Sequence, residues 1–137
     1  MSWTNTADYV VIGGGIQGVA IAYNLAKMGA QNVVVLEKDT VANGSTGRCG
    51  AGIRAQWGTE MNCRLGIASL DLFEQLSDEL GMDVGLNQCG YLMVAYKESE
   101  FATLKRSMVL QNGMGIKTRV VSREEAYEIC PGLAAED

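Results

Sequence analysis

Three glycines and an acid near the start of the chain have the types and spacing that bind a dinucleotide. Gly13, Gly15 and Gly18 directly follow one short apolar run, and Glu37 ends a second one. In the pattern Gly-x-Gly-x-x-Gly, the glycine at 15 lets a pyrophosphate approach the main chain, and the glycine at 18 lets a helix pack closely on the strands. A carboxylate after the second strand accepts hydrogen bonds from both ribose hydroxyls and repels a 2′-phosphate, which disfavours NADP. These residues predict binding of an adenine dinucleotide, with a redox cofactor as the default hypothesis.

The elements that must position these residues are a strand, a helix and a second strand. Residues 9–12 and 33–36 are apolar runs without alternation, as expected for parallel strands that are buried on both faces. Between them, apolar side chains recur at helical spacing and predict one buried stripe, formed by Ile16, Val19, Ala20, Tyr23 and Ala26. The first turn of this helix would direct free N–H groups and the positive end of its dipole at phosphates. A glycine-rich turn that binds nothing is the alternative, but packing alone requires neither three glycines nor the acid.

Residues 39–58 form a long glycine-rich loop. Its glycines are Gly44, Gly47, Gly50, Gly52 and Gly58. Long loops in compact domains are usually functional or disordered. Hydroxyl and charged side chains are interleaved here with apolar Ile53 and Trp57, an arrangement that a solvated linker does not need. We therefore expect a functional loop rather than a flexible linker.

The rest of the chain is expected to contain further helices and strands. The patterns predict helices over 59–80 and 99–112 and strands over 90–96 and 117–121. The first of these helices is a scaffold with a solvated acidic face, and Gly81 ends it. Ser122 and Glu125 form a capping box that begins a short helix, and Pro131 stops that helix.

Length, charge and composition exclude several classes of protein. The 137 residues correspond to one domain, and the net charge of −5 argues against binding to nucleic acid or to an anionic membrane surface. The sequence has no histidine, and its four cysteines are not spaced as zinc ligands are, so no metal site is expected. Neither a signal-peptide pattern nor an apolar run long enough to span a membrane is present. These features together predict a cytoplasmic protein with reduced thiols.

The order of the motifs resembles that of the D-amino-acid oxidase superfamily of FAD-dependent oxidoreductases. The matching motifs are residues 13–18, 36–38, 44–48, 50–54 and 90–94. Within the superfamily, the chain is similar to glycine oxidase, to sarcosine oxidase β subunits and to amino-acid dehydrogenases. The resemblance extends from Asp8 to Leu133. It implies FAD rather than NAD as the cofactor.

The resemblance also implies which residues bind FAD. They are Gly13, Gly14, Gly15, Ile16, Gln17, Gly18, Glu37, Lys38, Ser45, Thr46, Arg48, Gly50, Ala51 and Gly52. Glu37 corresponds to the acid that holds the adenosine ribose. Residues 45–48 correspond to the loop that runs past the pyrophosphate, and residues 50–52 to main chain that passes close to the flavin ring.

Two arginines and a cysteine in the same region have more than one interpretation. Arg54 corresponds to an arginine that faces the substrate carboxylate in several relatives, and it is the predicted catalytic-site residue. A planar guanidinium binds a carboxylate with two hydrogen bonds. A structural ion pair or a phosphate contact is the alternative for Arg54 and also for Arg48. Some relatives attach flavin to a cysteine, but later in the chain, so Cys49 is expected to be a small buried thiol.

The resemblance implies a fold that this chain does not complete. The expected class is α/β: a Rossmann-type FAD-binding βαβ unit with the start of a mixed substrate-domain sheet, incomplete without a partner chain. Residues 1–58 would form the FAD-binding unit with its flavin loop, and residues 59–137 the scaffold helix and the first part of the substrate region. Two parallel strands alone would expose unpaired edges. We therefore expect a second polypeptide that carries the rest of the flavoenzyme fold, unless the chain is a fragment.

The implied activity is oxidation of an amine or amino acid to an imine by hydride transfer to flavin. Glycine, sarcosine and proline-like substrates are consistent with the resemblance, and the cofactor itself carries the chemistry. The first alternative is a non-catalytic FAD-binding or electron-transfer subunit of a heteromeric complex. The second is an NAD-binding dehydrogenase domain. The loop 39–58 disfavours this second alternative, because NAD folds proceed quickly to their next αβ unit.

Overall fold

The computed structural model describes residues 6–133, which belong to two compact units. The chain divides between Gly52 and Ile53, so the units are Met1–Gly52 and Ile53–Asp137. The sequence placed this division after residue 58. Residues 53–57 belong to the second unit because they pack against the long helix that follows them.

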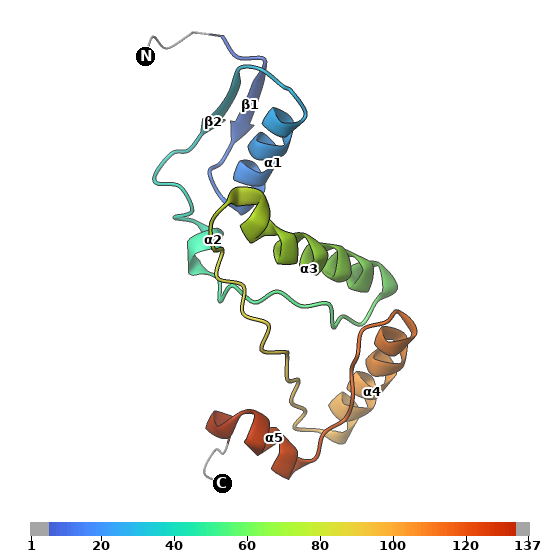
Figure 1. Ribbon diagram of the computed structural model, residues 1–137. Coiled ribbons are helices and arrows are strands. Elements are labelled where there is room, and N and C mark those ends of the chain that lie inside the picture. The colour runs from blue at the N-terminus through green and yellow to red at the C-terminus, as the bar shows by residue number, and fades with distance from the viewer. Residues whose placement is uncertain (1–5, 134–137) are drawn as a thin grey trace. The chain divides into compact units, whose positions relative to one another are not determined.

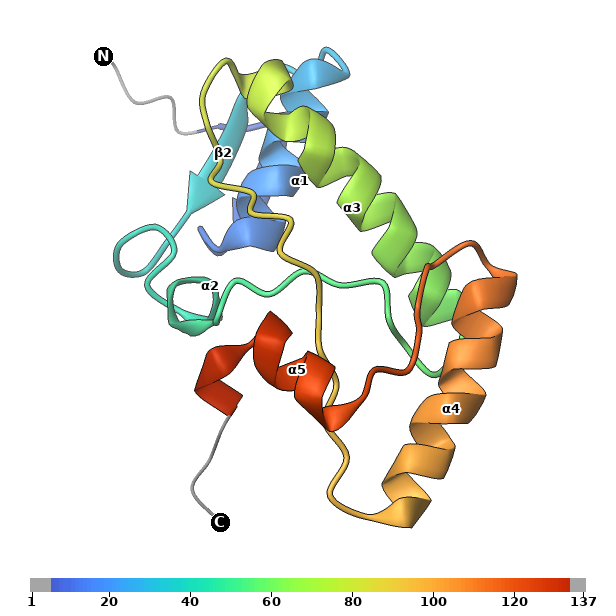
Figure 2. The ribbon, with the colours of Figure 1, turned by 60° about the horizontal axis from the view of Figure 1, so that its bottom comes forward.

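The first unit is a βαβ motif, as the sequence predicts. Strand β1 (Tyr9–Ile12) is followed by helix α1 (Ile16–Lys27) and strand β2 (Val33–Leu36). The two strands are parallel, and α1 contacts both of them (Figures 1 and 2). A main-chain hydrogen bond of 2.8 Å from Gly13 N–H to the Leu36 carbonyl continues the pairing into the turn. The glycine turn is thereby fixed at the carboxyl ends of both strands.

Gly18 is what allows α1 to begin directly after this turn. A Cβ atom at position 18 would lie 1.9 Å from the Gly13 carbonyl oxygen, which no side chain tolerates. Gly13 itself has φ +104°, a conformation that favours glycine. The glycine spacing therefore reflects the geometry of the turn, and not only the needs of a ligand.

The predicted burial of the strands and of the helix stripe is wrong for this chain. Val10 is 52% exposed, Ile12 is 87% exposed, and Ile16 on α1 is 57% exposed. The reason is that the sheet has two strands only, and one helix cannot cover both of its faces. Each strand also keeps one edge without a neighbour among the described residues.

The loop after β2 is held by hydrogen bonds and contains a short helix, α2 (Ser45–Arg48), that the sequence did not predict. Ala42 N–H donates to the Gly14 carbonyl at 3.0 Å, and Gly47 N–H donates to the Ala42 carbonyl at 2.8 Å. A Cβ at position 47 would lie 2.4 Å from that same carbonyl oxygen. These contacts place α2 beside the glycine turn, so this part of the loop is not a flexible linker.

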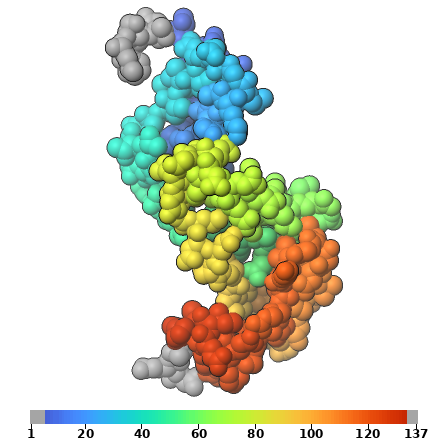
Figure 3. Space-filling model, in the orientation of Figure 1, coloured from blue at the N-terminus to red at the C-terminus, as the bar shows by residue number. Residues whose placement is uncertain are grey.

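The second unit consists mainly of helices at the positions that the sequence predicts. They are α3 (Glu60–Leu80), α4 (Glu98–Gly113), α5 (Arg123–Ile129) and the 3₁₀ turn η1 (Pro131–Leu133). Gly81 ends α3 in the left-handed conformation, and Ser122 Oγ accepts a hydrogen bond of 3.2 Å from Glu125 N–H at the start of α5. The surfaces of α3 and α4 meet in the space-filling view (Figure 3). None of the helices in the described part of the chain is long and apolar enough to cross a membrane.

The buried centre of the second unit joins residues 53–57 to α3 and α4. Cys63 on α3 is fully buried, and Ala55 and Gln111 are almost so. The Trp57 carbonyl accepts hydrogen bonds from Cys63 Sγ at 3.3 Å and from Gln111 Nε2 at 3.0 Å. Trp57 therefore ties both helices to the segment that carries Arg54.

The two strands predicted in this unit do not form. Residues 90–96 and 117–121 have no ladder partner, and β1 and β2 make the only sheet among the described residues. Both segments have strand-forming composition, but a strand also needs a hydrogen-bonded neighbour, which the sequence pattern cannot guarantee. The residues expected to begin the mixed substrate-domain sheet therefore do not form a sheet in the described structure.

Candidate functional site

A pocket of about 700 Å³ lies at the start of α1 in the first unit. Six of its lining residues are predicted cofactor-binding residues: Gly15, Glu37, Lys38, Ser45, Thr46 and Arg48. The structure thus brings together residues from the glycine turn, the end of β2 and α2. Asp39, Asn43 and Gly44 also line the pocket. None of the three was predicted to bind the cofactor, although Gly44 belongs to the matching motif 44–48. The Asn43 side chain donates a hydrogen bond of 2.6 Å to Asp39 Oδ2. The two residues are four positions apart in the sequence, and this spacing could have indicated a local turn.

The first turn of α1 presents free hydrogen-bond donors. The N–H groups of Gln17 and Gly18 have no acceptor among the described residues, as is usual for the first turn of a helix. Ile16 N–H donates to Thr46 Oγ1 at 3.0 Å. A Cβ at position 15 would lie 3.1 Å from that hydroxyl, so the glycine keeps this corner open. Free N–H groups together with the helix dipole make this corner suitable for a phosphate.

Glu37 is held by main-chain donors at the end of β2. Its Oε2 accepts a hydrogen bond of 2.7 Å from Gly14 N–H, and its Oε1 accepts one of 3.1 Å from Asp39 N–H. The bond from Gly14, and next the bond from Asp39, lower the pKa of the Glu37 carboxyl below its ordinary value of 4.5. The carboxylate is therefore ionised at neutral pH, and each oxygen keeps a lone pair that could accept from a sugar hydroxyl.

Two cations line the same pocket. Lys38 and Arg48 are both exposed, and neither forms an ion pair within the described part of the chain. The ion-pair alternative for Arg48 therefore receives no support from the described residues. Unpaired cations beside a helix N-terminus complement the negative charge of a pyrophosphate.

The end of the loop lies outside this pocket. Gly50, Ala51 and Gly52 do not line it, and they follow α2 as irregular chain. Ala51 has φ +51°, an unfavourable conformation for a residue with a side chain. Cys49 is exposed rather than buried as expected, and its Sγ donates to the Thr46 carbonyl at 3.1 Å.

Arg54 belongs to the second unit, where it is surrounded by aromatic side chains. Its guanidinium carbon lies 4.3 Å from the ring centre of Trp57 and 5.2 Å from that of Tyr91. Its Nη1 donates to Met93 Sδ at 3.8 Å, and no acid among the described residues pairs with it. The ion pair considered as the alternative for Arg54 is thus absent from the described structure, and the charge of Arg54 stays available for a ligand. The sequence did not indicate Tyr91 or Met93 as neighbours, because both are distant from Arg54 along the chain.

Comparison with known families identifies the chain. The sequence model of the FAD dependent oxidoreductase (DAO) family matches residues 8–137. The chain belongs to this family. The expected FAD-dependent oxidoreductase resemblance and the choice of FAD over NAD are thereby confirmed.

Individual members of the FAD dependent oxidoreductase family are similar to the chain over nearly its whole length. The crystal structure of L-proline dehydrogenase from P. horikoshii has a TM-score of 0.83 and 43% sequence identity, and the match covers 94% of this chain and 34% of that one. The mitochondrial pyruvate dehydrogenase phosphatase regulatory subunit of Mus musculus is 32% identical over 96% of this chain and 15% of its own length. Mitochondrial dimethylglycine dehydrogenase of Rattus norvegicus is 33% identical over the same shares. The chain therefore spans between about one seventh and one third of the length of these relatives.

The first unit fits the FAD of this family. Gly15 keeps open a corner that a Cβ would enter, and Gln17 and Gly18 offer N–H donors to a phosphate. Glu37 presents an ionised carboxylate beside them. Donors for phosphates next to an acceptor for sugar hydroxyls are the combination that an adenosine diphosphate group requires.

Proposed function

We propose that the chain is the FAD-binding portion of an oxidoreductase that oxidises a primary or secondary amino acid to an imine. The relative named L-proline dehydrogenase supports a substrate of this class, because proline is a secondary amine. Dimethylglycine, in the name of another relative, is a tertiary amine, and its oxidation would give an iminium ion instead. The proposal depends chiefly on one observation: the pocket at the start of α1, where free N–H groups and the anchored Glu37 carboxylate lie together.

In this proposal the cofactor is held by residues of the first unit. The N–H groups of Gln17 and Gly18 bind the pyrophosphate, and Lys38 and Arg48 balance its charge. Glu37 accepts hydrogen bonds from the adenosine ribose. When bound, FAD supplies the hydride acceptor for amine oxidation. The protein then needs no histidine, because a neutral amine can lose hydride without a general base.

Arg54 is proposed to bind the substrate carboxylate. Stacking on Trp57 and Tyr91 fixes the plane of its guanidinium without neutralising the charge. A fixed plane favours two parallel hydrogen bonds to a carboxylate and so orients the amino acid.

A second polypeptide is proposed to supply the rest of the fold. The open edges of β1 and β2 and the exposed apolar residues of the first unit support this part of the proposal. The chain also spans only a fraction of the length of its relatives. If the rest of the fold is a separate polypeptide, and not further residues of a longer chain, the enzyme would be active as a heteromer.

The test is an absorbance spectrum of the chain purified from its native source with whatever co-purifies. We expect flavin absorbance that is bleached under anaerobic conditions by one of four amino acids: proline, dimethylglycine, sarcosine or glycine. Absence of flavin from the preparation would contradict the cofactor assignment. Candidate substrates with the carboxylate replaced by an amide provide the control, since Arg54 should not bind them.

A non-catalytic FAD-binding subunit is the second candidate function. The similarity to a protein named as a regulatory subunit favours it. In that case the flavin spectrum would be present, but none of the four amino acids would bleach it, and chemical reduction with dithionite would still do so.

A further inference from the structure

Met93 is the neighbour of Arg54 whose hydrogen-bonding strength can change by a chemical modification. Its Sδ accepts a hydrogen bond of 3.8 Å from Arg54 Nη1. A thioether sulfur is a weak acceptor, so a carboxylate can replace it as the partner of the guanidinium. The other neighbours of the guanidinium are the rings of Trp57 and Tyr91, which carry no formal charge. Arg54 is therefore held by contacts that a stronger acceptor can displace.

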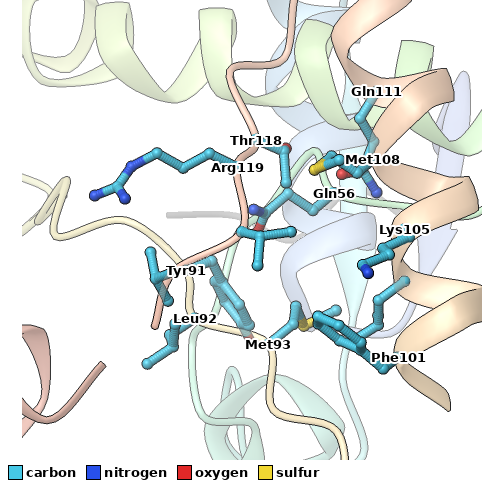
Figure 4. A pocket seen from close by; sticks show the side chains of 13 residues that line it. Gln56, Tyr91, Leu92, Met93, Phe101, Lys105, Met108, Gln111, Thr118 and Arg119 are labelled. Atoms are coloured by element: carbon cyan, nitrogen blue, oxygen red, sulfur yellow. The ribbon is translucent and has the colours of Figure 1, made fainter. Parts of the chain in front are cut away.

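Small molecules can reach the Met93 side chain. It is 38% exposed, and together with Tyr91 and Phe101 it lines a pocket of about 130 Å³ in the second unit (Figure 4). A water molecule occupies about 30 Å³ in the liquid, so this pocket has room for a molecule of similar size. Hydrogen peroxide is larger than water by one oxygen atom only. Because Met93 Sδ and Arg54 Nη1 are in contact, a path that brings an amino acid to Arg54 also brings a peroxide to the sulfur.

Hydrogen peroxide oxidises a methionine thioether to the sulfoxide. The sulfur attacks one peroxide oxygen and loses two electrons, so that a sulfur–oxygen bond forms as the oxygen–oxygen bond breaks. The hydroxide that departs takes up the remaining proton and leaves as water. The product is polar, and its oxygen is a much stronger acceptor than the thioether sulfur. Because a sulfur–oxygen bond is far shorter than the 3.8 Å between Met93 Sδ and Arg54 Nη1, this oxygen can hydrogen-bond with the guanidinium.

We propose that Met93 is a site of reversible oxidation by hydrogen peroxide, and that its sulfoxide competes with the substrate carboxylate for Arg54. The effect on catalysis rests on the proposed function, in which Arg54 binds the substrate. The reduced thioether leaves the guanidinium available, and the sulfoxide occupies it. Losing one hydrogen bond between charged groups lowers affinity by about tenfold or more. The cofactor is retained, because Met93 belongs to the second unit and the pocket at the start of α1 to the first.

Peroxide treatment of the flavin-containing preparation from the native source tests this proposal. Peptide mass spectrometry should find one added oxygen atom on Met93. The KM for the amino acid that bleaches the flavin should rise about tenfold, while kcat changes by less than about twofold. Phenylglyoxal, a dicarbonyl reagent for accessible guanidinium groups, should react more slowly with Arg54, which gives a readout independent of activity. The two methionine sulfoxide reductases, one for each sulfoxide epimer, should reverse all three changes.

Three variants separate Met93 from the other methionines. Met93→Leu keeps a similar volume without the sulfur, so its KM should be the same before and after peroxide treatment. Met82→Leu is the matched control, because Met82 is 64% exposed and lies outside this pocket. It should respond to peroxide as the native protein does. Met93→Gln introduces an amide oxygen in place of the sulfoxide oxygen and should raise KM without any peroxide.

The results that would overturn the proposal differ in what they say of the proposed function. If Met82 is oxidised and Met93 is not, or if Met93 is oxidised and Arg54 reacts as before, the inference fails while the proposed function stands. If Arg54 reacts more slowly but KM is unchanged, Arg54 does not bind the substrate, and its proposed role fails together with the inference. If no amino acid bleaches the flavin even before peroxide treatment, the proposed function fails, and the phenylglyoxal reaction of Arg54 alone decides whether the sulfoxide binds it.

Discussion

Glu37 is the side chain whose protonation should decide whether the proposed cofactor is held. Hydrogen bonds from the N–H groups of Gly14 and Asp39 lower the pKa of its carboxyl. Because this pKa is lowered, the ionised Glu37 carboxylate stabilises the folded chain fully above the ordinary carboxyl pKa of 4.5. This stabilisation is lost as the pH falls through the pKa of the folded state. We expect flavin retention to be constant from neutral pH down to that range and to fall below it. Titration of bound flavin against pH checks this.

The variant Glu37→Gln separates this effect from general acid unfolding. It should retain less flavin at neutral pH and should show a weaker pH dependence below the ordinary carboxyl pKa. Asp71→Asn is the control, because this exposed acid lies on α3 in the second unit and does not line the pocket. Identical pH profiles for the native protein and Glu37→Gln would show that another group governs retention.

Gly15 is expected to be essential for FAD retention. A Cβ at this position would already approach Thr46 Oγ1 to 3.1 Å, so the larger side chain of Gly15→Val would fill the corner offered to the pyrophosphate. We expect at least a tenfold loss of bound flavin with little change in helix content, measured by absorbance and circular dichroism. Gly58→Val is the control, since a Cβ there meets only Ser107 Oγ at an ordinary 3.5 Å. Normal flavin content in Gly15→Val would show that the pyrophosphate does not bind in this corner.

Arg54 should affect substrate binding far more than flavin binding. In the assembled enzyme, Arg54→Ala should lower kcat/KM by about 10- to 100-fold, because a charged hydrogen-bonding group to the carboxylate is lost. Arg54→Lys should recover only part of this, since an ammonium cannot bind with two parallel bonds or stack on Trp57 in the same way. The surface variant Arg64→Ala, which breaks only an exposed pair with Glu60, is the control. Equal losses of substrate and flavin affinity would assign Arg54 to the cofactor.

Gly66 in α3 controls where the Arg54 segment lies. A Cβ at this position would lie 2.7 Å from Ala55 Cα and 2.8 Å from the Arg54 carbonyl oxygen. Although alanine favours helix over glycine by about 1 kcal/mol, overpacking costs about 1–3 kcal/mol, so Gly66→Ala should lower the free energy of unfolding. Urea unfolding checks this, with Gly113→Ala on α4 as the control, because no atom lies near its Cβ position. A stabilised Gly66→Ala would show that residues 53–57 do not pack tightly on α3.

Elements with local signals were predictable from the sequence, and those that depend on distant partners were not. The βαβ motif, α3 and α5 follow from glycine spacing, helical periodicity and the Ser122 cap, which are properties of neighbouring residues. Residues 90–96 and 117–121 have the composition of strands, but no second strand lies beside them among the described residues. The pocket that joins Gly15, Glu37 and Arg48 was predictable because the family resemblance links these motifs. The aromatic contacts of Arg54 were not predictable, because Tyr91 reaches it only through tertiary packing.

The exposed apolar surface predicts how the chain behaves without a partner. Only Ala55 and Cys63 are buried apolar residues within the described range, whereas Ile12 and Met28 are among many large apolar side chains left exposed. Open strand edges and exposed apolar patches drive self-association. We expect the isolated chain to bind a hydrophobic dye and to self-associate at micromolar concentration, and to do neither in complex with its partner. Sedimentation velocity and dye fluorescence check this, with Ile12→Thr expected to weaken association without abolishing the βαβ fold. A monodisperse, dye-silent chain would contradict this expectation and would remove the exposed apolar surface as an argument for a partner.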